Sequence, residues 1–162
     1  NWTAGGTHPT VIQNTAAAGT QTAGWAAGGI IDSSPGTSNT FSSSTNEYNG
    51  SSWTSSGSLP IATYRAGAAG TQTGALIFSG GTSPGGPGGP GESVTTLGYD
   101  GTSWSTRPNM ATARQSVGAG GVSSPSTAAI GAGGYVIPGT TASTEEFTGE
   151  TETITSKTLT TS

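Results

Sequence analysis

The sequence predicts an all-β protein of repeated blades, each a small four-stranded antiparallel sheet. Three tryptophans, Trp2, Trp53 and Trp104, are each 51 residues apart. Segments 19–22 and 70–73 both read Gly-Thr-Gln-Thr and are separated by the same 51 residues. The chain is also rich in Gly, Ser, Thr and Ala, residues that suit short strands and tight turns rather than helices. Four extended segments in a period of about 50 residues are typical of a β-propeller blade.

The period divides the chain into three units, residues 1–52, 53–103 and 104–149, followed by an extended tail at residues 150–162. Each unit is expected to contain a strand that begins at the tryptophan and an Ala- and Gly-rich strand. An apolar strand before a double glycine and a strand ending in an aromatic residue complete the unit. Because one blade cannot bury its own faces, we expect neighbouring blades to cover each other.

Two turns follow from the aromatic strand ends. Tyr48 leads into Asn49-Gly50, and Tyr99 leads into Asp100-Gly101. Asn-Gly and Asp-Gly favour the two positive φ values of a type I′ hairpin turn, so we expect that turn in both units. Phe147 heads a weakened third copy.

Recurring residues are interpreted as structural parts of the repeat. They are Trp2, Trp53, Trp104, Tyr48, Tyr99, Phe147, Arg65, Arg114 and the double glycines Gly28-Gly29, Gly80-Gly81 and Gly133-Gly134. The two arginines follow Ala-Thr or Thr-Ala, and we place them in equivalent positions, where the first unit has Asn14. A guanidinium offers five hydrogen-bond donors, and we expect each arginine to connect adjacent loops by donating to carbonyl groups.

Composition excludes several classes of function. With 30% hydrophobic residues the core must be thin, and with 7% charged residues the chain does not resemble a highly charged disordered segment. Four Lys and Arg residues at a net charge of −4 give no basic patch for nucleic acid. No apolar run approaches the roughly 20 residues that cross a bilayer, so no membrane insertion is expected.

Candidate catalytic and metal-binding groups are sparse. His8 is the single histidine, followed by Pro9, with nothing nearby to suggest a Ser/His/Asp arrangement, and there is no Cys. The densest carboxylates are Glu145, Glu146, Glu150 and Glu152. Neighbouring strand residues point to opposite faces, so we interpret them as a solvated edge rather than an acid pair or a cation site. We therefore predict no enzyme, no cofactor and no metal.

Two further features leave alternatives open. Trp25 breaks the repeat, and it either packs between blades or stacks on a sugar ring as a ligand contact. The run of Pro-Gly-Gly triplets at residues 84–91 is interpreted as a stiff exposed loop, with an intermolecular contact as the alternative.

The repeat resembles the kelch motif. The matching residues are Leu59-Pro60, Tyr64-Arg65, Gly80-Gly81, the aromatic before Asp100-Gly101, and Trp104. More narrowly, Tyr-Asn-Gly-Ser-Ser-Trp-Thr, Ala-Gly-Thr-Gln-Thr and Glu-Glu-Phe-Thr-Gly are similar to degenerate kelch-like repeats encoded by marine bacteriophages. The resemblance covers residues 1–150. It implies a β-propeller in a tail fibre, an appendage or a virion decoration, and hence a virion or extracellular location.

The expected function is therefore that of a non-enzymatic structural or adhesive virion protein. Its expected partners are other copies of itself, other virion proteins and a host-surface glycan. Three units are fewer than the four to eight blades of a closed ring. We expect other chains or a longer chain to complete it, with Trp2 supplying a fourth strand to the last unit in the same chain or a neighbour. The alternatives are a carbohydrate-binding or depolymerising adhesin and a cellular kelch scaffold that binds proteins.

Overall fold

The structure is a computed structural model that describes residues 1–31, 40–82, 91–121 and 127–149. Within these ranges the regular structure consists of β-strands and contains no helix, so the predicted all-β class is confirmed. The described residues accordingly hold no helix that could cross a membrane. The predicted Pro-Gly-Gly loop and the tail at residues 150–162, with Glu150 and Glu152, lie outside the described residues.

Blade 1 is a four-stranded antiparallel sheet with the strand order β2-β3-β6-β7. Its strands are β2 (Ala16–Thr20), β3 (Ala23–Ala27), β6 (Thr45–Tyr48) and β7 (Trp53–Ser56). Strands β2 and β3 form a hairpin in which Thr20 pairs with Ala23. The first Gly-Thr-Gln-Thr segment therefore ends the innermost strand and begins its turn.

Blade 2 repeats this order as β8-β9-β10-β11. Its strands are β8 (Gly67–Thr71), β9 (Gly74–Phe78), β10 (Thr96–Tyr99) and β11 (Trp104–Arg107). Every residue of β9 is buried. Its nearly continuous apolar sequence, Gly-Ala-Leu-Ile-Phe, suits a strand that is covered on both faces, here by the flanking blades.

Blade 3 has three strands in the order β12-β13-β16, namely β12 (Gly118–Gly120), β13 (Ala128–Ala132) and β16 (Thr144–Thr148). Among the described residues no strand pairs with the outer edge of β16. In blades 1 and 2 that outer place belongs to the tryptophan strand. Each complete sheet therefore takes its fourth strand from the beginning of the next sequence unit.

Five short strands connect the blades. They are β1 (Ile12–Gln13), β4 (Ile30–Ile31) and β5 (Thr40–Phe41) in one small sheet, and the hairpin of β14 (Tyr135–Val136) and β15 (Gly139–Thr140).

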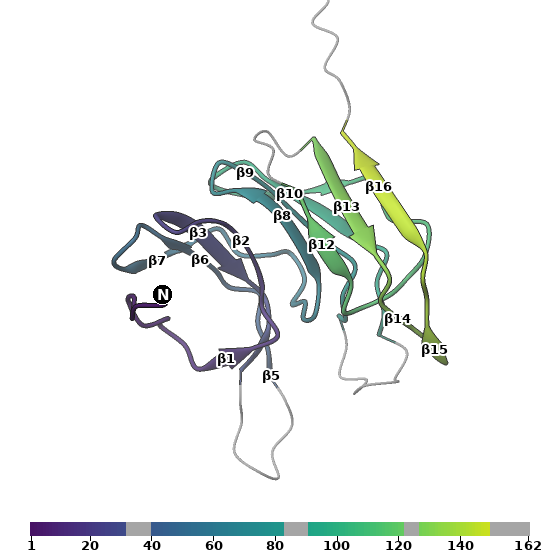
Figure 1. Cartoon of the computed structure of the whole chain (residues 1–162), viewed down its shortest axis with the longest axis horizontal. Coiled ribbons are helices and arrows are strands. Elements are labelled where there is room, and N and C mark those ends of the chain that lie inside the picture. Colours follow the sequence, from purple (N-terminus) through teal and green to yellow (C-terminus); the bar gives the residue numbers. More distant parts are fainter. Residues whose placement is uncertain (32–39, 83–90, 122–126, 150–162) are drawn as a thin grey trace, which may run out of the picture.

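The three blades lie side by side in chain order (Figure 1). Their innermost strands β2, β8 and β12 lie next to one another. The Gly70 amide donates directly to the Gly121 carbonyl at 3.0 Å, and a Cβ on Gly121 would lie 3.0 Å from the Ala69 methyl. Such a close approach requires the small side chains found here. Convergence of the Ala- and Gly-rich strands therefore holds the row together at one edge.

The predicted hairpins exist, but the predicted turn type is wrong. Gly50 and Gly101 have φ values of 97° and 96°, whereas Asn49 and Asp100 are not in the left-handed region. Tyr48 pairs with Trp53, which leaves four residues in the turn. The Asn49 side-chain oxygen accepts from the amides of Ser51 and Ser52 at 3.0 and 2.9 Å. This side-chain bonding replaces the conformation that a type I′ turn would require of Asn49.

Asp100 repeats the arrangement in blade 2. Its Oδ1 accepts from the amides of Ser103 and Thr102 at 2.7 and 2.8 Å. These two hydrogen bonds, with that from Ser103 first, hold the pKa of Asp100 below its usual value because they favour the charged carboxylate.

Candidate functional site: the joints between blades

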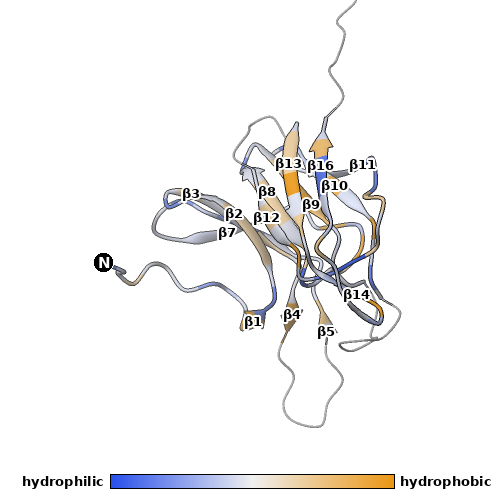
Figure 2. Ribbon diagram, turned by 45° about the vertical axis from the view of Figure 1, so that its right-hand side comes forward, coloured by the Kyte–Doolittle hydropathy of each residue, from blue (hydrophilic) through white to orange (hydrophobic). Residues whose placement is uncertain are grey.

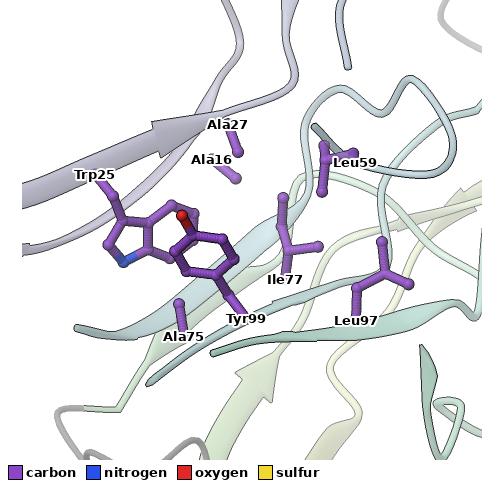
Figure 3. Packing of buried hydrophobic residues seen from close by; sticks show 8 residues of the cluster. All are labelled: Ala16, Trp25, Ala27, Leu59, Ala75, Ile77, Leu97 and Tyr99. Atoms are coloured by element: carbon purple, nitrogen blue, oxygen red, sulfur yellow. The ribbon is translucent and has the colours of Figure 1, made fainter. Parts of the chain in front are cut away.

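Polar and aromatic side chains concentrate where one blade meets the next. We call the contact of blades 1 and 2 the first joint and that of blades 2 and 3 the second joint. The first joint encloses an apolar cluster in which residues of blade 1 face residues of blade 2 (Figure 3). The clustered residues are Ala16, Trp25, Ala27, Leu59, Ala75, Ile77, Leu97 and Tyr99.

Trp104 fastens the outer part of the first joint. Its indole N–H lies 2.9 Å from Thr45 Oγ1, on β6 of blade 1, and 3.0 Å from the carbonyl oxygen of Gly57, which follows β7 of the same blade. Its ring packs edge-on against Trp25, with centroids 5.7 Å apart, and obliquely against Tyr99 at 4.8 Å. Blade 2 is thus anchored to blade 1 by the indole N–H and by the ring contact with Trp25, while Tyr99 supports the ring from within blade 2.

Tyr99 and Gln72 make the remaining polar contacts of this joint. The Tyr99 hydroxyl donates to Glu47 Oε1 at 2.7 Å and contacts the Ser56 hydroxyl. Gln72, in the turn of the second Gly-Thr-Gln-Thr segment, donates from Nε2 to the Gly24 and Tyr48 carbonyls at 2.7 and 2.8 Å. The residues that mark the repeat therefore connect one blade to its neighbour.

Blade 1 carries a similar contact on its other side. The Trp53 indole donates to the Gly6 carbonyl at 3.0 Å, and the Gly6 amide donates to the Tyr48 hydroxyl at 3.1 Å. Gly6 precedes Gly57 by 51 residues. Both glycines let the backbone approach closely, because an added Cβ would lie 2.1 Å from the Ser51 oxygen at Gly6 and 2.0 Å from the Thr102 oxygen at Gly57.

Trp2 differs from the other two repeat tryptophans. Its side chain is fully exposed and lies outside the sheets, so the expected packing role of Trp2 is not seen within this chain.

Phe147, the third aromatic, packs on the smaller cluster of the second joint, which consists of Ala69, Leu76, Phe78 and Ala129 with Met110 and Val117.

The double glycines lie at sharp corners after the second strand of each blade. Gly28 and Gly29 have φ values of 66° and 109°, and Gly133 and Gly134 have 63° and 113°. In blade 2 the matching pair is Ser79 and Gly80, with φ values of 67° and 94°. The expected pair Gly80-Gly81 is therefore displaced by one residue. Gly81 instead makes room for Tyr64, whose ring would lie 2.5 Å from an added Cβ.

The two arginines do not occupy equivalent positions, so the placement expected from the sequence is wrong. Asn14, Arg65 and Ser116 share a left-handed conformation, with φ values of 56°, 53° and 56°, and are each 51 residues apart. Arg114 lies two residues before this position. The Arg65 guanidinium carbon lies 5.9 Å from the Tyr64 ring centroid, so its observed contact is with an aromatic face rather than with a loop carbonyl.

Arg114 is fully buried and makes an ion pair that the sequence did not reveal. Its guanidinium donates to the carbonyls of Gly133 and Ser143 at 3.0 and 2.8 Å, and to Glu145 Oε1 at 2.7 Å. The other Glu145 oxygen accepts from the Ala111 amide at 2.7 Å. Glu145 is therefore drawn into the structure rather than lying on a solvated edge, whereas Glu146 is exposed as expected.

The candidates for ligand chemistry have structural surroundings. Trp25 is 1% exposed, which favours its packing role and leaves no indole face for a sugar. His8 Nδ1 lies 2.9 Å from the Thr10 carbonyl, and its ring packs against Trp53 at 5.0 Å. Over the described ranges no three His, Asp or Glu side chains are grouped so as to hold a metal ion.

No protein-family model matches the chain, and a search of curated proteins found no match.

Proposed function

We propose that the chain is a non-enzymatic structural and adhesive protein, a kelch-like propeller module on the exterior of a virus particle. Within a tail fibre, an appendage or the outer shell, its blades would join copies of the chain and present their exposed turns to a host surface. Support comes from where the repeat residues act. Trp104, Tyr99 and Gln72 all bond across a blade boundary.

The observation that carries most weight is the repeated tryptophan contact. Trp53 bonds to Gly6 as Trp104 bonds to Gly57, at 3.0 Å in both cases. The side of blade 1 that faces away from blade 2 therefore carries the same kind of contact that joins blades 1 and 2, which suits a further blade as its neighbour. The contacts of the first joint are mainly apolar packing and hydrogen bonds, so high salt should weaken them little.

Two measurements test this function. Immunogold labelling of particles whose genome encodes the chain should place the protein at a regular position on the virion. Sedimentation of the purified chain should reveal self-association that persists from low salt to the ionic strength of seawater. Protein confined to the unassembled fraction of lysed cells, with unlabelled particles, would contradict the proposal.

A further inference from the structure

An open pocket lies between blades 2 and 3, at the place that Trp104 fills in the first joint. Trp104 is held there by Thr45, Gly57 and Tyr99. The counterparts of these residues one repeat further along the chain are Thr96, Pro108 and Phe147, and all three line the pocket. Its volume is about 350 Å³, including the part open to solvent. The second joint therefore has the walls of a tryptophan socket without an indole among the described residues.

The outer face of blade 3 is also incompletely covered. Ile130 is 44% exposed, whereas Trp25 and Leu76, which hold the same register in blades 1 and 2, are each 1% exposed. The inner-strand partners of these three residues are Ala18, Ala69 and Gly120, each 51 residues apart. A following blade covers Trp25 and Leu76, so the apolar segment of β13 is built to be covered as well (Figure 2).

The N-terminal segment has the properties of a fourth strand for blade 3. Trp2 precedes Trp53 by 51 residues, and Gly6 already occupies the place of Gly57 against the next blade. Residues 2–5 therefore correspond to strand β7. In both ribbon views the N-terminus lies on the side of the molecule away from β16, so the segment does not reach its own blade 3 (Figures 1 and 2).

Blade 1 offers the other halves of the joint. Gln21 is exposed and corresponds to Gln72, which holds blade 2 to blade 1. The Tyr48 hydroxyl accepts from the Gly6 amide, which leaves its own proton for donation. The exposed Glu146 of blade 3 corresponds to Glu47, the acceptor of the Tyr99 hydroxyl. The two open faces thus carry matched donors and acceptors.

We propose that a second copy of the chain docks by its blade 1 on the outer face of blade 3 and inserts Trp2 into the socket. Its residues 2–5 pair with β16 as the fourth strand, with Trp2 opposite Phe147 and Thr3 opposite Glu146. Two chains that exchange strands in this way contain six blades, within the four to eight of closed propellers. The inference rests on the proposed self-association and specifies its surface.

Cysteine cross-linking tests the register directly, because the chain contains no Cys. Thr3→Cys and Glu146→Cys proteins, mixed and mildly oxidised, should give a reducible species of twice the 15.7 kDa chain mass. Each variant alone should give far less. Replacing Glu146→Cys by Ser105→Cys, an exposed position on β11 of blade 2, should give only background cross-linking.

Affinity measurements supply the second arm. Trp2→Ala and Gln21→Ala should each weaken dimerisation at least tenfold in sedimentation equilibrium, with an unchanged unfolding curve because both side chains are exposed. Val11→Ala, an exposed apolar residue nearby, should match the parent. Dimers that form unchanged in Trp2→Ala and without the specific cross-link would overturn this interface while leaving self-association intact. A chain that stays monomeric would overturn it as well, and particle labelling would decide the virion role independently.

Discussion

The Tyr99 hydroxyl donates to Glu47 Oε1 at 2.7 Å, across the boundary between two blades. Burial, assisted by the neighbouring Glu47 charge, raises the pKa of Tyr99 to about 12. Because the folded pKa lies above the unfolded value of about 10, the contribution of neutral Tyr99 to stability is complete below pH 10. It should be lost as the pH rises from 10 to 12.

Urea unfolding of the parent and of Tyr99→Phe at pH 8, 10 and 11.5 would measure this effect. At pH 8 the variant should be about 1 kcal/mol less stable because the hydroxyl bonds are lost. That difference in stability should shrink at pH 11.5, because ionisation of Tyr99 then favours the unfolded state of the parent, whereas the variant has no hydroxyl to ionise at this position. Tyr135→Phe, a half-buried tyrosine outside the first joint, serves as the control. A constant difference at all three pH values would contradict the assigned role.

Trp104→Phe keeps an aromatic ring but removes the N–H that bonds to Thr45 and Gly57. We expect the free energy of unfolding to fall by about 1–3 kcal/mol, because Thr45 is buried and loses a donor. Trp53→Phe is the matched control, since among the described residues the Trp53 N–H bonds to Gly6 of the N-terminal segment alone. An equal or larger loss in Trp53→Phe would show that the first joint is not the stronger contact.

Gln72→Ala and Gln21→Ala separate folding from assembly. Gln72 donates to two carbonyls of blade 1 at 2.7 and 2.8 Å, whereas Gln21 is exposed. Thermal denaturation of the dilute monomer should show a loss of about 1–2 kcal/mol for Gln72→Ala and no measurable loss for Gln21→Ala. Equal effects would mean that the turn glutamine stabilises its own hairpin rather than the joint.

Gly28→Ala should be strongly destabilising. Its φ of 66° costs an L-residue about 1–2 kcal/mol, and an added Cβ would lie 2.1 Å from the Thr63 carbonyl oxygen. Gly139 has no atom within 4 Å of an added Cβ, so Gly139→Ala should stay within about 0.5 kcal/mol of the parent. Chemical denaturation of both proteins compares them, and a tolerated Gly28→Ala would refute the corner geometry.

Periodicity predicted the larger features of the fold because it reports on positions that recur in every blade. Trp53 and Trp104 begin the outer strands, and Tyr48 and Tyr99 end the strands beside them. The same periodicity could not locate the corner after the second strand of a blade to within one residue. Ser79 adopts the left-handed conformation expected of glycine, and its hydroxyl bonds to the Arg114 carbonyl, which no local sequence pattern indicates.

Contacts that depend on tertiary context escaped the sequence altogether. Arg114 and Glu145 are 31 residues apart and belong to no repeated pair, so nothing in the spacing linked them. Trp2 shows the converse case. Its place in the period was clear, but whether an indole is covered depends on which strand lies beside it, and the sequence does not specify that neighbour.

The hydrogen bond between Trp104 and Thr45 joins residues 59 positions apart, so the first joint can form only late during synthesis of the chain. As the chain leaves the ribosome, the apolar side of blade 1 remains bare until nearly all of blade 2 has emerged. Nascent chains released before Trp104 should therefore be prone to stick to chaperones or to one another. Polypeptides that extend past it should resist proteolysis as a unit.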